Sequence, residues 1–158
     1  MDKSEKKVYV RVSGARSDGQ RRQMEQIVRD GICPFCREHL EKYHEGKIVE
    51  ETEHWVLTQN DHPYAGTTTH LLFIAKEHVT RPERLSNEAM IDLFRLFGKA
   101  TADLKGATLF MRTGEMSYTG ATVDHLHAHI ISGMSADEGG EAVKAKVAFG
   151  APLTLLKK

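Results

Sequence analysis

Three histidines at strict alternation constrain this chain more than any other feature of its sequence. Residues 123–131 read Val-Asp-His-Leu-His-Ala-His-Ile-Ile. A period of two is typical of a β-strand, so His125, His127 and His129 are predicted to share one face, roughly 6–7 Å apart along the strand. The residues between them are apolar and suit a core. Packing alone favours β-branched residues on a strand, so the row of imidazoles indicates chemistry; the alternative is a cluster of surface histidines.

The size and charge of the chain exclude some classes of protein. Its 158 residues predict one domain, with a core that buries about two-thirds of the surface of the unfolded chain. Because 22 basic residues balance 22 acidic ones, binding of nucleic acid through overall charge is not expected. The longest apolar runs, such as residues 71–75, are far too short to cross a membrane.

The first residues and the cysteines predict a cytoplasmic location. Residues 1–7 are polar or charged after the initial methionine and contain no apolar stretch of the kind found in signal peptides. The only cysteines, Cys33 and Cys36, lie together in a Cys-Pro-Phe-Cys segment. One such pair does not provide the disulfide framework of a secreted protein.

The order of apolar segments and breakers predicts a mixture of strands and helices. Ser17 is expected to cap a helix over residues 20–30, and Ser86 a longer one that continues to about residue 104. Strands are expected at 47–51, 54–59, 67–75, 107–112 and 123–131, a helical turn at 37–43, and loops at 60–66 and 113–122. A short polar link between the first two strands indicates a hairpin. These elements predict an α+β domain on an antiparallel sheet of about five strands, with one long helix and shorter helices.

Two further apolar patterns concern the long helix and the start of the chain. The stripe of the long helix that is expected to face the core consists of Met90, Leu93, Phe94 and Phe97. A short strand or an ordered arm is indicated near the start by the alternation of Val8, Val10 and Val12.

The triad and the segments before it resemble the histidine triad (HIT) superfamily. Residues 125–131 follow its pattern of His-apolar-His-apolar-His-apolar-apolar. An apolar strand ending in Lys76-Glu77-His78, a long helix, a strand and a glycine loop precede the triad in the family's order. The resemblance covers residues 33–132 and implies a HIT-like fold. We expect an N-terminal arm and helix at 1–30, a HIT-like domain at 31–135, and a C-terminal tail at 136–158 that packs on the domain.

The resemblance implies an enzyme that attacks the α-phosphate of a nucleotide. Imidazole has an unperturbed pKa of about 6.5, is nucleophilic near neutral pH, and can form a covalent phosphoramidate. By resemblance His127 is the nucleophile, His129 binds phosphate oxygens or the leaving-group side, and His70 orients the site. The other interpretation of His70 is an ordinary histidine at a strand end. The implied substrates are nucleoside monophosphate conjugates: phosphoramidates, dinucleoside polyphosphates or nucleotide sugars.

The loop before the triad departs from the family's pattern. Gly120 and Thr122 are expected to bind substrate, through the backbone and a hydroxyl group. Family members often carry Gln or Ser where Ala121 stands, and Asn near Thr113, and each such donor is worth a few kcal/mol. Two neighbouring side chains are candidates to replace them: Arg112 and Ser117. The departure leaves open an alternative, a zinc-stabilised nucleotide-binding module with little or no turnover.

The loop at residues 60–66 contains a candidate for ribose binding. Asn60 lies where the family places an acidic or amide side chain, just before Pro63-Tyr64. A short amide or carboxylate makes good hydrogen bonds to hydroxyl groups, so Asp61 is the alternative. The plainer interpretation of Asn60 is a turn residue.

The two cysteines predict a second site. Two thiolates at the Cys33–Cys36 spacing suit tetrahedral zinc. The histidines nearest in sequence, His39 and His44, are the local candidates to complete the site. A redox pair and two free thiols are the other interpretations, and the redox pair lacks a convincing preceding strand of a βαβ unit.

The resemblance points to a different pair of metal ligands. Zinc-bearing members of the superfamily use the histidine after the buried strand and the first histidine of the triad, which are His78 and His125 here. A structural zinc would then tie the cysteine turn to the strand of His127, with no organic cofactor. Homodimers are common in such members, and neither a nucleic acid nor a membrane is expected as a partner. A metal-dependent hydrolase with the three triad histidines as ligands is a further alternative, for which no nearby carboxylate is an obvious base.

Overall fold

One antiparallel sheet organises the molecule. The computed structural model describes residues 7–139, 144 and 147–150. Within them the strands are β1 (Ile48–Glu51), β2 (Trp55–Gln59), β3 (Thr69–Ala75), β4 (Thr108–Met111) and β5 (His127–Ser132). Their order across the sheet is β1-β2-β3-β5-β4, and every neighbouring pair is antiparallel. The predicted α+β class and the hairpin of the first two strands are confirmed.

The two longer helices have the caps that the sequence indicates, although the first begins at Asp18 and the second ends at Thr101 rather than near residue 104. The helices are α1 (Asp18–Asp30), α2 (Arg37–Tyr43), α3 (Asn87–Thr101) and α4 (Met116–Thr119), with 3-10 turns η1 (Val12–Gly14), η2 (Pro82–Arg84) and η3 (Ala136–Glu138). Ser17 caps α1 by accepting from the Gln20 N–H, and Ser86 caps α3 in the same way from the Ala89 N–H. Gly31, at a φ of 67°, ends α1. The short helix α4 lies inside the segment that was expected to be a loop.

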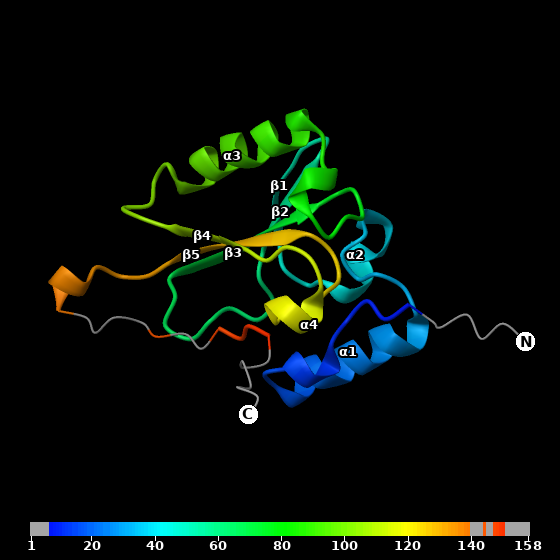
Figure 1. Ribbon diagram of the computed structural model, residues 1–158. Coiled ribbons are helices and arrows are strands. Elements are labelled where there is room, and N and C mark those ends of the chain that lie inside the picture. Colours follow the sequence, from blue (N-terminus) through cyan, green and yellow to red (C-terminus); the bar gives the residue numbers. More distant parts are fainter. Residues whose placement is uncertain (1–6, 140–143, 145–146, 151–158) are drawn as a thin grey trace, which may run out of the picture.

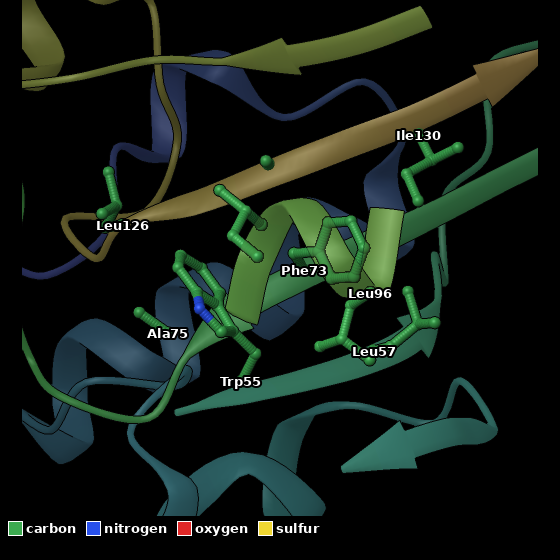
Figure 2. Packing of buried hydrophobic residues seen from close by; sticks show 9 residues of the cluster. Trp55, Leu57, Phe73, Ala75, Leu96, Leu126 and Ile130 are labelled. Atoms are coloured by element: carbon green, nitrogen blue, oxygen red, sulfur yellow. The ribbon is translucent and has the colours of Figure 1, made fainter. Parts of the chain in front are cut away.

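The main core fills the space between one face of the sheet and α3 (Figure 1). Figure 2 shows side chains of β2, β3 and β5 converging on Leu96 of α3. Trp55 and Phe73 are fully buried there, and each such side chain contributes roughly 2–3 kcal/mol. The Trp55 Nε1–H also donates to the Ala89 carbonyl at 2.7 Å. Strand alternation therefore places the residues between the triad histidines in the core, as expected.

The stripe predicted for α3 is wrong at two positions. Met90 and Phe94 are 37% and 64% exposed, whereas Ala89, Leu93 and Leu96 are buried. Helical spacing allows both stripes. The structure buries the stripe that includes the small Ala89, whose carbonyl also accepts the Trp55 hydrogen bond.

The opposite face of the sheet carries α2 and, farther out, α1 (Figure 1). Leu40 of α2 packs there against Val56, Leu72 and Ile74. A third cluster joins the start of the chain to both helices and consists of Val10, Met24, Ile27 and Tyr43. Within the described residues, no helix has the length and apolar character to cross a membrane.

Two local predictions about strands need correction. The triad strand begins at His127, and the chain bends at Asp124 and His125 before it. His125 therefore does not share a strand with the other two histidines. The valine alternation near the start gives only a single bridge, between Val10 and Val123, because the chain turns into η1 directly afterwards.

Candidate functional site

The catalytic candidates His127 and His129 lie in the middle of the sheet. β5 pairs with β3 on one side and β4 on the other, which sets His129 opposite Leu72 and Phe110. His127 and His129 are only 7% and 9% exposed. The interpretation of the triad as a surface cluster is therefore wrong, and both rings have fixed hydrogen-bonding partners.

One ring nitrogen of His127 is held by the backbone. Its Nδ1–H donates to the carbonyl oxygen of His125 at 2.6 Å, since a carbonyl can only accept. The neutral ring then carries its lone pair on Nε2. Burial lowers the pKa of His127, with the Arg112 charge as a further cause, so the ring stays neutral and nucleophilic. The ring of Phe35 packs edge-on against it.

His70 fixes the proton of His129. The Tyr64 N–H donates to Nδ1 of His70 at 3.0 Å, so the neutral His70 carries its proton on Nε2. That nitrogen lies 2.9 Å from Nδ1 of His129 and 2.9 Å from the Asn60 amide nitrogen. Because an amide nitrogen accepts no hydrogen bond, the proton is donated to His129.

His129 consequently presents an N–H group to which no described residue offers an acceptor. With Nδ1 as acceptor, the proton of neutral His129 lies on Nε2, and this buried atom has no hydrogen-bond partner among the described residues. Burial, and after it the charges of His127 and His70, lower the pKa of His129. Burial also lowers the pKa of His70 to about 4, followed by the charge of Arg16. Both rings are neutral at pH 7. A buried N–H group normally has a hydrogen-bond acceptor, so Nε2 of His129 is positioned to donate to a bound ligand.

Two adjoining cavities meet at these histidines. We call the first the apolar cavity; most of its lining is apolar, and it includes Val10, Met24, Ile27, Phe35, Tyr43 and Leu72. We call the second the arginine cavity; its lining includes Arg16, Tyr64, Arg112, Gly120, His127 and His129. Five residues border both: Arg16, Gln20, Thr122, His127 and His129. His127 and His129 thus lie where the apolar cavity and the arginine cavity adjoin.

Asn60 and Asp61 both line the apolar cavity, but their side chains have different roles. The Asn60 Oδ1 accepts from the His62 N–H at 2.9 Å, and its amide nitrogen faces His70. The Asp61 carboxylate pairs with His44 Nδ1 at 3.1 Å and accepts from the Gly46 N–H. Asp61 is thus committed to holding the loop. The sequence did not indicate this pair, because its members are 17 residues apart in the chain (61 − 44).

The predicted phosphate loop borders the arginine cavity. Gly120 has a φ of 70°, and a Cβ there would lie 2.4 Å from the Ala148 carbonyl oxygen, so only glycine fits. Thr122 borders both cavities. Of the two candidate replacements for missing donors, Arg112 lines the arginine cavity, whereas Ser117 lines neither of the two cavities.

The cysteines form a separate cluster with two histidines from distant segments. The ligand atoms of Cys33, Cys36, His78 and His125 all lie within 4.8 Å of one another. His125 Nδ1 is 3.3 Å from the Cys33 Sγ and 3.2 Å from His78 Nδ1. His78 Nδ1 is 3.3 Å from the Cys36 Sγ. Tetrahedral zinc at about 2.0–2.3 Å from each ligand requires separations of roughly 3.3–3.8 Å, which these atoms nearly meet.

The surroundings of the cluster fit a cation. The His125 Nε2–H donates to the Ala75 carbonyl at 2.6 Å, which leaves Nδ1 free to bind a metal. Burial raises the pKa of Cys36 to about 12, so a thiolate there requires a nearby positive charge. These four residues therefore form a group that is able to hold a metal ion.

The other interpretations of the histidines near the cysteines do not match the geometry. His39 Nδ1–H donates to the Cys33 carbonyl at 3.1 Å, and His44 pairs with Asp61. Neither belongs to the cluster. Of the triad, only His125 belongs to it, which contradicts a metal site made of all three triad histidines.

Comparisons with known proteins agree with this architecture. The model of the HIT domain family matches residues 41–136. A HIT family hydrolase from Clostridium thermocellum is 27% identical, with a TM-score of 0.53 over 70% of this chain and 96% of that one. A HIT family protein from Bacillus anthracis is 27% identical, with a TM-score of 0.52 over 72% and 82%. A histidine triad nucleotide-binding protein from Candida albicans, 22% identical, shares the fold with a TM-score of 0.56 over 78% and 86%. No curated protein matches the sequence.

Proposed function

This chain belongs to the HIT domain family, and we propose that it is a nucleotide hydrolase or nucleotidyl transferase with His127 as its nucleophile. The substrates in this proposal are nucleoside monophosphate conjugates: phosphoramidates, dinucleoside polyphosphates or nucleotide sugars. One observation carries it. The buried His127 ring is held by the His125 carbonyl with its lone pair on Nε2. Beside it is the Nε2–H of His129, which has no partner in the part of the chain that the structure describes. A nucleophile and a donor thus border one space, as attack on a phosphate requires.

The proposed reaction has two steps. His127 Nε2 forms a bond to the α-phosphorus, the bond from phosphorus to the leaving group breaks, and its electron pair departs with that group. The His129 Nε2–H donates a hydrogen bond to a phosphate oxygen or to the leaving atom. The oxygen of water, or of another acceptor, then attacks phosphorus. The P–N bond breaks, its electrons return to His127 Nε2, and one proton is released.

The remaining site residues have supporting roles in this proposal. His70 positions His129 through their 2.9 Å hydrogen bond. Asn60 binds the ribose hydroxyls in the apolar cavity, which receives the nucleoside. The Gly120 backbone and the Thr122 hydroxyl hold phosphate oxygens at the border of the arginine cavity.

We propose that the ion at the four-residue cluster is a structural zinc, held by Cys33, Cys36, His78 and His125. When bound, it neutralises the thiolates and joins the cysteine turn to the segment before β5. A site of this kind contributes about 10 kcal/mol to folding. The reaction uses no organic cofactor. Thiolates that bind metal must stay reduced, so we place the protein in the cytoplasm.

We also propose that the chain forms a homodimer and has no nucleic-acid or membrane partner. β4 ends the sheet at one edge, and the exposed apolar side chains of α3 include Ile91 and Phe94. Light scattering of the purified protein tests this. The proposed division remains an arm and helix at 1–30, a domain at 31–135 and a tail at 136–158. Residues 152–156 of that tail lie outside the described residues.

The function is tested with a panel of AMP and GMP conjugates. We expect release of the nucleoside monophosphate, and a trapped phosphohistidine on His127 that His127→Asn abolishes while the fold is kept. Full turnover by His127→Asn rules out the mechanism. Tight binding without release by the wild-type protein favours the alternative, a zinc-stabilised binding module, which is motivated by the missing side-chain donors near Thr113 and Ala121.

A further inference from the structure

The arginine cavity contains two cationic side chains to which the proposed reaction gives no role. Arg16 lies just before α1, and Arg112 follows β4. Both line the cavity together with His127 and His129. Because those histidines also border the apolar cavity, a nucleotide with its nucleoside in the apolar cavity directs its leaving group toward the two arginines.

Each arginine is held in place without neutralisation of its charge. Arg16 Nη2 donates to the His62 carbonyl at 2.6 Å, and its guanidinium lies 4.8 Å from the centroid of the Tyr64 ring. Arg112 donates to the Thr119 and Ala148 carbonyls at 2.8 and 3.1 Å. Carbonyls and aromatic faces orient a guanidinium but leave it fully charged.

Within the described part of the chain, the arginine cavity offers these charges no counter-ion. Neither arginine forms an ion pair with a carboxylate of the described residues. No aspartate or glutamate belongs to the described lining of the cavity. Beside the arginines lies the buried Nε2–H of His129, which has no partner among the described residues. Two guanidinium groups and the His129 N–H around one cavity suit an anionic ligand with several acceptor oxygens.

We propose that Arg16 and Arg112 bind a phosphate group of the leaving group. The inference rests on the proposed function and narrows its substrates to nucleotides joined through a phosphoanhydride to a second phosphate. When His127 attacks, the bond from the α-phosphorus to the bridging oxygen breaks. Both electrons stay on that oxygen, so the departing phosphate gains a negative charge next to the guanidinium groups. An amine released from a phosphoramidate needs a proton and gains no negative charge.

The segment that supplies Arg16 lies outside the residues matched by the family model. The match begins at residue 41, whereas Arg16 precedes the Ser17 cap of α1, and its N–H donates to the Gln20 side chain at 2.7 Å. Gln20 also lines both cavities. The proposed anion site therefore depends on a segment outside the residues that the family model matches.

The kinetic test compares two leaving groups on the same nucleoside. We measure kcat/KM for diadenosine tetraphosphate and for adenosine 5′-phosphoramidate with wild type, Arg16→Gln and Arg16→Lys. The ratio of the two values should fall about 10- to 100-fold in Arg16→Gln and less in Arg16→Lys, which keeps the charge. Arg22→Gln, an exposed change in the adjoining helix α1, is the matched control and should keep the wild-type ratio. An unchanged ratio in Arg16→Gln, or an equal loss with both substrates, overturns the proposal.

A binding test separates this inference from the proposed function. In His127→Asn, calorimetry should give ADP about tenfold higher affinity than AMP, and the added Arg16→Gln change should remove the difference. If the wild-type protein turns over neither substrate, the proposed function fails. The comparison of ADP and AMP affinities in His127→Asn still shows whether the anion site exists. Equal affinities for AMP and ADP in His127→Asn overturn the anion site whatever the turnover.

Discussion

The backbone carbonyl of His125 accepts a hydrogen bond from the ring of His127 at 2.6 Å. The ring of His125 belongs to the four-residue cluster, where its Nδ1 lies 3.3 Å from the Cys33 Sγ. One residue therefore contacts the other members of the cluster with its side chain and holds the candidate nucleophile with its backbone. Disruption of the cluster is therefore expected to shift His125, and with it the ring of His127, and so to lower the reaction rate.

Removal of one cysteine tests that connection. Cys33→Ser should lower the zinc content well below one equivalent, lower the free energy of unfolding by roughly 3 kcal/mol or more, and lower kcat. Elemental analysis, thermal unfolding and turnover are measured on the same preparations. His39→Gln, which changes a neighbouring histidine outside the cluster, should retain the metal. Wild-type stability and zinc content in Cys33→Ser contradict the assignment.

Two phenylalanines, one on β3 and one on α3, test which side chains belong to the main core. Phe73 is fully buried and Phe94 is 64% exposed. Phe73→Ala should cost about 3–5 kcal/mol of unfolding free energy, whereas Phe94→Ala should change it by less than about 0.5 kcal/mol. The single tryptophan, Trp55, lies in the same core and reports unfolding by its fluorescence. Should Phe73→Ala fail to fold, Phe73→Leu provides a smaller loss; similar losses for the two positions contradict the packing.

The positions of the strands along the chain were largely predictable from local pattern, whereas their order in the sheet was not predicted. Continuous apolar residues identified β3, and alternation placed Ala128 and Ile130 in the core, because strand periodicity needs no knowledge of distant segments. The stripe of α3 was predicted only in part: Leu93 and Phe97 pack in the main core, whereas Met90 and Phe94 are exposed. The Trp55 Nε1–H also donates to the Ala89 carbonyl, a contact between residues 34 apart in the chain that local pattern does not indicate.

The candidate site was predictable only where a motif or a resemblance pointed to it. The resemblance pointed to His78 and His125, whereas the histidines nearest to the cysteines in sequence are His39 and His44. The structure brings His78 and His125 to the cysteines. Arg16 was missed. It precedes an ordinary helix cap, and only the packing of α1 brings it to the cavity.

The acid stability of the protein should depend on Glu51. Its carboxylate pairs with Arg37 at 2.9 Å and with Lys76 at 2.8 Å, and these hydrogen bonds lower the pKa of Glu51 to about 2. A folded-state pKa below the unfolded value of about 4.3 means that this stabilisation is complete above pH 4.3 and is lost as the pH falls toward 2. Solvent screening limits the contribution of the Glu51 ion pairs to the free energy of unfolding to about 1 kcal/mol.

Denaturant unfolding between pH 7 and pH 2 measures this contribution. Other carboxylates titrate in the same range, so the difference between wild type and Glu51→Gln is the relevant quantity. The difference should be present at pH 7 and disappear toward pH 2. Glu53→Gln, at an exposed position close by, should follow the wild-type curve throughout. A wild-type advantage over Glu51→Gln that persists at pH 2 contradicts the ion pairs as its cause.

His70 is expected to act on the reaction only through His129. Its Nε2–H donates to Nδ1 of His129 and thereby keeps the proton of that ring on Nε2. His70→Leu removes the donor and allows the other tautomer, so kcat should fall roughly 100-fold. His70→Gln, which keeps an N–H donor, should retain activity to within about tenfold of wild type. If both variants lose stability but keep kcat, His70 is a packing residue; if both lose kcat equally, the tautomer argument is wrong, because the restored donor would have had no effect.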